Sequence, residues 1–193
     1  YALAPEQPFP VAVSETLTVL DHLLQNTRKN IHLLGVSAGG NLATVATLEG
    51  HRRYPGRITS ALLTAPMLNP ACDSISCCQN SQSSWLLPLE WLAWCWRVYL
   101  RLDQTEANDD DSPEHAMSLS NNNRTAWNAS RFKNTVMERL IHPALFVPKN
   151  ITTRFIVTTN KADLLHDDGV ELVEALRSNN NNVRHFDHSG PHV

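Results

Sequence analysis

The chain carries Gly35-Val36-Ser37-Ala38-Gly39 directly after a short apolar run and directly before a helix-forming stretch. A serine between two glycines at a turn from strand to helix predicts a sharp turn that lifts the serine hydroxyl above a sheet. Because such a turn is tight, we expect Gly35 and Gly39 to tolerate no larger side chain. The next backbone N–H, that of Ala38, would point at a developing oxyanion. The motif also occurs in ordinary loops, but its position between a strand and a helix makes Ser37 a candidate nucleophile.

The composition is that of an ordinary globular chain. Its 193 residues fit one domain, residues 1–193, with 42% hydrophobic and 18% charged residues. The formal net charge of -3 provides no basic patch, so nucleic acid is not an expected partner. No apolar run approaches the roughly 20 residues of a membrane-spanning helix, so membrane association is not expected either.

The cysteine pattern predicts no metal centre. The four cysteines form neither a Cys-x-x-Cys pair nor a zinc-binding spacing: Cys72, Cys77, Cys78 and Cys95. The first three lie in one polar stretch, which is compatible with a disulfide in an oxidising compartment and equally with free thiols in a reducing one.

Apolar periodicity predicts strands that alternate with helices. The expected strands are residues 31–36, 58–65, 154–159 and 183–187. Four helices are expected. The first has about four turns and includes residues 13–24, the second ends near residue 51, and the other two cover residues 88–101 and 168–178. Residues 105–130 are acidic and then Asn/Ser-rich, and are expected to form a surface excursion. This order predicts an α/β fold with a mostly parallel sheet and helices on both faces.

A serine nucleophile needs a base, and the base needs a carboxylate that orients it. Asp163 follows the third expected strand and His192 follows the fourth. Both residues therefore belong to loops at the carboxyl ends of parallel strands, which is the edge where open α/β sheets bind ligands. The order along the chain, Ser37 then Asp163 then His192, is that of the α/β-hydrolases.

Neighbouring residues offer alternatives for two of these roles. His188 lies at the end of the last expected strand, but we favour His192 because the turn of residues 189–191 can present it. Asp167 and Asp168 are alternatives to Asp163, and we expect them instead to cap the following helix, whose N-terminus favours negative charge.

Several stretches together resemble the hormone-sensitive-lipase-like branch of the α/β-hydrolases. They match the family's order from one end of the chain to the other: Tyr-Ala-Leu-Ala-Pro-Glu at 1–6 with Pro-Phe-Pro at 8–10, Gly-Val-Ser-Ala-Gly-Gly-Asn-Leu-Ala at 35–43, Asp-Leu-Leu-His-Asp at 163–167, and Pro-His-Val at 191–193. The resemblance implies a partial α/β-hydrolase fold that lacks the family's N-terminal strands and cap. The family usually has an acidic residue at the position of Val36, and its His-Gly-Gly-Gly oxyanion block lies before the segment that matches residues 1–6.

The resemblance also implies an activity and the residues that perform it. The activity is that of a carboxylic ester hydrolase acting on acyl or acetyl esters of small molecules without a cofactor. Ser37 would be acylated, His192 would shuttle the proton, Asp163 would hold the imidazole and the Ala38 N–H would bind the oxyanion. Gly35, Gly39 and Gly40 would shape the turn around the serine.

A Trp-rich stretch lies where the family has part of its lid and acyl pocket. It contains Trp85, Trp91, Trp94, Trp96 and Tyr99. We select Trp91 and Trp94 as candidates for an aromatic pocket wall. Packing of this helix onto the sheet is the alternative for each of these side chains.

Two other functions remain open at this level. An amidase or formamidase can use the same serine, histidine and aspartate, since these residues do not determine the leaving group. A ligand-binding receptor without catalysis is known among plant relatives of the family, partly because the histidine is replaced there. The presence of His192 argues against the receptor.

Overall fold

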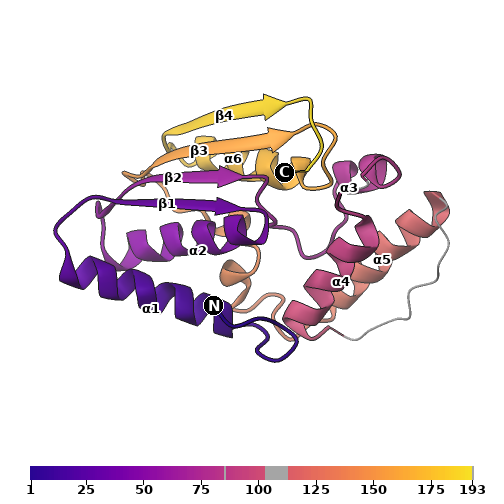
Figure 1. The fold of residues 1–193 in the computed structure, drawn as a ribbon, viewed down its shortest axis with the longest axis horizontal. Helices are drawn as coiled ribbons and strands as arrows, with labels where there is room; N and C mark the ends of the chain where they lie inside the picture. Colours follow the sequence, from indigo (N-terminus) through magenta and orange to yellow (C-terminus); the bar gives the residue numbers. More distant parts are fainter. Residues whose placement is uncertain (85, 103–112, 193) are drawn as a thin grey trace.

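The computed structural model describes residues 1–84, 86–102 and 113–192. Its centre is one parallel sheet in the order β1-β2-β3-β4, and the strands point toward the same edge (Figure 1). The strands are β1 (Ile31–Val36), β2 (Ile58–Thr64), β3 (Arg154–Asn160) and β4 (Val183–His188). The expected strands are thus confirmed, with differences of one residue at three carboxyl ends.

Within the described residues, six α-helices and two 3₁₀ turns connect or flank the strands. They are α1 (Val11–Asn26), α2 (Ala38–Arg53), α3 (Ile75–Asn80), α4 (Leu89–Leu100), α5 (Pro113–Asn128), α6 (His166–Ser178), η1 (Glu138–Leu140) and η2 (Pro143–Phe146). The part of the chain between β2 and β3 that contains α3, α4 and α5 lies beyond the carboxyl ends of the strands (Figure 1).

The expectation of a surface excursion at 105–130 is wrong for residues 113–128, which form α5. This helix packs against α4, and its Asn123 and Trp127 are buried. The amide nitrogen of Asn123 donates to the carbonyl oxygen of Pro70 at 3.2 Å, so the buried polar group is satisfied. Tertiary packing therefore determines a helix where the composition suggests none. Residues 105–112 of the expected excursion lie outside the described residues.

The expectation of helices on both faces of the sheet is also wrong. Side chains of both α2 and α6 pack against the same face of β2 and β3: Ala43, Leu48, Leu172 and Leu176 against Ala61, Leu63, Phe155 and Val157. The strands succeed one another in one direction across the sheet, and right-handed crossovers then place their helices on one face. Figure 1 shows the strands above α2 and in front of α6. On the opposite face Leu34 is 69% exposed and Phe186 is 48% exposed.

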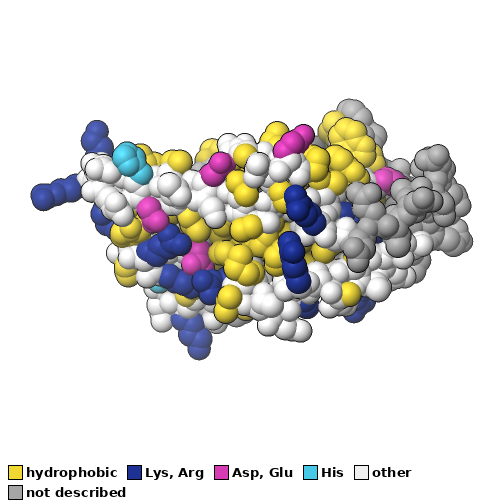
Figure 2. All heavy atoms as spheres, turned by 90° about the horizontal axis from the view of Figure 1, so that it is seen from below, with side chains coloured by type: hydrophobic (Ala, Val, Ile, Leu, Met, Phe, Trp, Pro, Cys, Tyr) yellow, Lys and Arg dark blue, Asp and Glu magenta, His cyan; other side chains and the backbone are white. Residues whose placement is uncertain are grey.

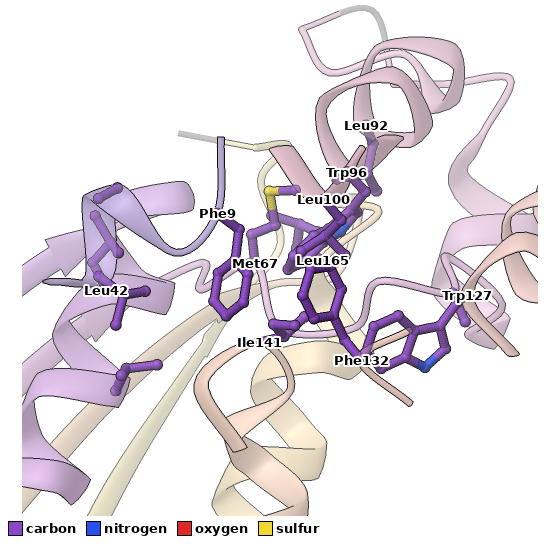
Figure 3. Close-up of a cluster of buried hydrophobic side chains, with 14 of the residues drawn as sticks. Phe9, Leu42, Met67, Leu92, Trp96, Leu100, Trp127, Phe132, Ile141 and Leu165 are labelled. Carbon is purple, nitrogen blue, oxygen red and sulfur yellow. The ribbon is translucent and has the colours of Figure 1, made fainter. Parts of the chain in front are cut away.

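A second cluster of buried side chains joins α1, α4 and α5 to the carboxyl edge of the sheet (Figure 3). At its centre Phe9 packs edge-to-face on Phe132, with 5.0 Å between the ring centroids. Trp96 of α4 and Trp127 of α5 are each 1% exposed within this cluster. The cluster therefore holds α4 and α5 over the edge where the candidate nucleophile lies.

The outer side of α1 is not fully polar. Val19 is 60% exposed and Leu23 is 44% exposed on this helix. Figure 2, which shows the face beneath α1, has hydrophobic side chains gathered near its middle and Lys and Arg side chains around them.

The turn between β1 and α2 is crowded at Gly35 and Gly40 and open at Gly39. Ser37 has a φ of 52° and a ψ of -120°, a backbone conformation that L-residues rarely adopt. A Cβ atom at Gly35 would lie 2.7 Å from the Cβ of Ala43, and one at Gly40 would lie 2.8 Å from the Cα of Pro66. A Cβ at Gly39 would meet nothing within 4 Å, so the expectation of a tight site there is wrong.

We predict opposite effects of the same substitution at two glycines of this turn. Gly35→Ala would force Ala43 and the backbone of Gly39 to move, which costs about 1–3 kcal/mol of unfolding free energy. Gly39→Ala places a methyl group in open space within α2 and is expected to stabilise the protein by about 0.5–1 kcal/mol. Urea denaturation of the full-length protein measures both values. Equal destabilisation by the two variants would contradict the prediction.

Candidate active site

Three side chains from distant parts of the sequence form one hydrogen-bonded chain. The Oγ atom of Ser37 lies 3.1 Å from Nε2 of His192, and Nδ1 of His192 lies 2.8 Å from Oδ2 of Asp163. Asp163 is completely buried, and the side chain of His192 is 12% exposed. A serine, a histidine and a carboxylate in this order are positioned for proton transfer from the hydroxyl to the imidazole.

The loop after β3 holds the buried carboxylate in a fixed direction. Its second oxygen, Oδ1 of Asp163, accepts a hydrogen bond of 3.0 Å from the backbone N–H of Leu165. The amide nitrogen of Asn80, at the end of α3, donates to the carbonyl oxygens of Lys161 and Asp163, each at 2.9 Å. One oxygen thus faces the imidazole while the other is satisfied by the backbone of its own loop.

The loop after β4 carries the imidazole into place. The N–H of Lys161 donates to the carbonyl oxygen of His188, and the N–H of Ala162 donates to that of Gly190. These bonds hold the loop of His192 beside the loop of Asp163. His188 itself ends β4 as an exposed residue and takes no part in the hydrogen-bonded chain described above.

The expectation that Asp167 and Asp168 cap the following helix is wrong, because both lie within the first turn of α6, which has no side-chain cap, and their carboxylates bond to other segments. Asp167 accepts a hydrogen bond of 2.8 Å from the N–H of Ser76 and lies 2.9 Å from the ring of His166. Asp168 accepts from the N–H groups of Leu68 and Asn69. Burial raises the pKa of Asp168 to about 8, although these two N–H groups act in the opposite direction.

The N-terminus of α2 begins immediately after the serine. Ala38 is the first residue of this helix, so its N–H belongs to the groups that lack a partner within the helix. The partial positive charge of the helix end favours an anion at the same place. The environment beside the Ser37 hydroxyl therefore suits a negatively charged oxygen.

An apolar cavity of about 230 Å³ opens beside the serine. The α4 residues on its wall recur at helical spacing: Leu92, Cys95, Trp96 and Tyr99. Other wall residues come from the N-terminal segment, α2 and the loop after β2, among them Tyr1, Leu3, Ser37, Ala38, Leu42 and Met67. Such a lining suits the hydrocarbon part of a small molecule.

The selection of Trp91 and Trp94 as pocket residues is wrong. They are 67% and 56% exposed and lie on the outward side of α4, whereas Trp96 and Tyr99 line the cavity. The sequence could have distinguished the outward pair from the cavity pair by helical spacing, because Leu92, Trp96 and Tyr99 share one face of α4. Trp85 lies outside the described residues.

The described residues show neither a metal centre nor a disulfide. Within the described ranges no group of three or more His, Cys, Asp and Glu side chains could hold a metal ion. All four cysteines are free thiols, and burial raises the pKa of Cys72 and of Cys77. Among the described helices none is long and apolar enough to cross a bilayer.

Solved structures share this fold. An esterase from Pyrobaculum calidifontis superimposes with a TM-score of 0.74 at 22% identity, and covers 100% of this chain and 55% of its own. An arylesterase superimposes with a TM-score of 0.71 at 20% identity over the same shares. The chain thus spans about half the length of these structures, and identities this low show the fold alone.

Sequence relatives agree with the structures. Hormone-sensitive lipase of Mus musculus is 35% identical over 127 residues, which are 62% of this chain and 16% of the lipase. A protein of Acanthamoeba polyphaga mimivirus with an α/β-hydrolase name is 27% identical over 126 residues, 62% of this chain and 36% of that protein. A sequence model of the α/β-hydrolase fold family matches residues 1–192. Because this match spans nearly the whole chain, the protein belongs to the α/β-hydrolase fold family.

Proposed function

We propose that the protein hydrolyses carboxylic esters through an acyl-enzyme intermediate on Ser37. The observation that carries the proposal is the hydrogen-bonded chain from Ser37 through His192 to Asp163, at the side of an apolar cavity. The relatives named above include a lipase and esterases, which supports the same reaction class. No cofactor enters the proposed chemistry.

In the first half of the reaction, the Ser37 oxygen attacks the ester carbonyl carbon while Nε2 of His192 takes the hydroxyl proton. The carbonyl oxygen becomes an oxyanion, to which the Ala38 N–H donates. The tetrahedral intermediate collapses, the bond to the alcohol oxygen breaks, and the imidazolium returns its proton to that oxygen. The alcohol leaves and the acyl group remains on Ser37.

In the second half, water replaces the alcohol. His192 takes a proton from the water, and the hydroxide adds to the acyl carbon. The second intermediate releases the carboxylic acid, and the proton on His192 returns to the Ser37 oxygen. The buried Asp163 carboxylate stabilises the imidazolium in both halves and holds the ring in the tautomer whose Nε2 can accept a proton.

We predict that the full-length protein hydrolyses members of a p-nitrophenyl ester series from acetate to octanoate and that Ser37→Ala does not. Loss of the nucleophile is expected to lower kcat by about 10⁴-fold or more, because only binding and oxyanion contacts remain. Release of p-nitrophenolate measures the rate. Hydrolysis of anilides but of no ester would replace the proposal with an amidase, and stoichiometric ligand binding without turnover would replace it with a receptor.

We predict that Asp163→Asn lowers kcat by about 10³–10⁴-fold with little change in KM. The amide keeps the shape of the side chain but no longer stabilises the imidazolium or its working tautomer. Steady-state kinetics on p-nitrophenyl butyrate checks this, with circular dichroism as the control for folding. Asp167→Asn, on the neighbouring carboxylate, is the matched variant and is expected to keep kcat within about twofold. A small effect at Asp163 would contradict its assignment.

We predict that Cys95→Phe shortens the acyl chain that the cavity accepts. Cys95 is half-buried on the cavity wall, so a phenyl ring there would displace about two methylene groups of a long acyl chain. At about 0.8 kcal/mol per buried methylene, kcat/KM for octanoate should fall by about tenfold or more while that for acetate is retained. Trp94→Phe, on the outward face of α4, is the control. An equal loss for both esters would show that the cavity does not hold the acyl chain.

A further inference from the structure

A short segment after β2 connects the nucleophile turn to the rest of the site. We call residues 65–69 the strap. The backbone N–H of Met67 donates to the carbonyl oxygen of Ser37 at 3.1 Å. The amide nitrogen of Asn41 donates to the carbonyl oxygen of Met67 at 3.0 Å. The strap is therefore bonded once to Ser37 itself and once to the first turn of α2.

The other side of the strap is bonded to a single carboxylate oxygen of α6. Oδ2 of Asp168 accepts hydrogen bonds from the N–H groups of Leu68 at 2.7 Å and Asn69 at 2.9 Å. Asp168 is 2% exposed and stands five residues after Asp163, in the first turn of the helix that follows the Asp163 loop. One side chain thus connects the first turn of α6 to the backbone behind Ser37.

A carboxylate in this place is costly, so packing alone does not explain it. Removal of a carboxyl group from water disfavours its charged form, and here burial raises its pKa to about 8. Without an acceptor, however, two backbone N–H groups would lose their hydrogen-bond partner in a largely buried place. The two hydrogen bonds therefore connect residues 68 and 69 to the first turn of α6.

We propose that Asp168 is a positioning residue that sets the separation of Ser37 and Asp163 through the strap, so that His192 can bond to both at once. This inference rests on the proposed function. Hydrogen bonds and backbone connect Ser37 to Met67, the strap to Asp168, and the first turn of α6 to Asp163. This connection between Ser37 and Asp163 does not include the imidazole of His192. Misplacement of a reacting group by about 1 Å can cost about 10²-fold in rate.

The neighbouring Asp167 provides the matched control. It stands in the same turn of α6, but its carboxylate accepts from the N–H of Ser76 at the start of α3 and makes no hydrogen bond to the strap. Removal of either carboxylate deletes hydrogen bonds to the backbone. Only the loss of Asp168 is expected to change the position of the nucleophile.

The test compares Asp168→Asn, Asp168→Leu and Asp167→Leu in the full-length protein. Because both N–H groups bond to one oxygen of Asp168, the carbonyl of an asparagine can accept both, and Asp168→Asn is expected to keep kcat within about fivefold. Asp168→Leu has no acceptor and is expected to lower kcat on p-nitrophenyl butyrate by about 10²-fold at unchanged KM. Asp167→Leu is expected to keep kcat within about twofold. Rates are divided by the concentration of active sites from burst titration, so that a loss of folded protein does not count.

A second readout does not depend on ester turnover. The Ser37 oxygen displaces fluoride from a fluorophosphonate probe and passes its proton to His192, and the rate of this labelling should fall in Asp168→Leu and recover in Asp168→Asn. Where Asp168→Leu does not fold, Asp168→Ala removes the acceptor without added bulk and has the same expected result. Normal kcat and labelling without the acceptor, or an equally large loss in Asp168→Asn, would overturn the proposal. If the unaltered protein is labelled but hydrolyses no ester, the proposed function is refuted. The role of Asp168 is then still tested by the labelling rates of Asp168→Leu and Asp168→Asn.

Discussion

The hydrogen bond between Nδ1 of His192 and the fully buried Asp163 is the interaction on which the site depends. A buried carboxylate needs a hydrogen-bond donor at each oxygen, and here the imidazole and the N–H of Leu165 provide the two donors. The parallel sheet makes this meeting possible, since the loops after β1, β3 and β4 all leave from one edge. The ring is in turn aimed at Ser37, which a strained backbone conformation presents at that edge.

Two clusters of buried side chains support the candidate site, and one of them also lines the cavity. The core between the sheet, α2 and α6 fixes the strands, whereas the second cluster around Phe9, Trp96 and Trp127 holds α4 above the serine. The same helix contributes Trp96 to this cluster and to the wall of the cavity. Trp91 and Trp94 lie on the outer face of the same helix. Substitutions at these two positions therefore leave the shape of the cavity unchanged.

The strands and the meeting of three candidate site residues could be predicted from the sequence because their signals are local. The strand runs are apolar and bounded by turn residues, and Ser37, Asp163 and His192 follow strand ends in a recognisable order. Contacts between segments that are distant in the sequence could not be predicted in the same way. The open surroundings of Gly39, the crowded ones of Gly40 and the helix α5 all depend on neighbours from distant segments, such as Pro66 and α4. The outward direction of Trp91 and Trp94 follows from helical spacing, because both residues are out of phase with Leu92, Trp96 and Tyr99, whereas aromatic character alone does not reveal it.

The place of Cys95 has a consequence for inhibition experiments. This half-buried thiol stands on the wall of the cavity, and burial raises its pKa, so little reactive thiolate forms at neutral pH. Slow alkylation by a maleimide would nonetheless place a bulky adduct in the space beside the serine. Inactivation by sulfhydryl reagents would then report obstruction of the cavity rather than a cysteine that performs the chemistry.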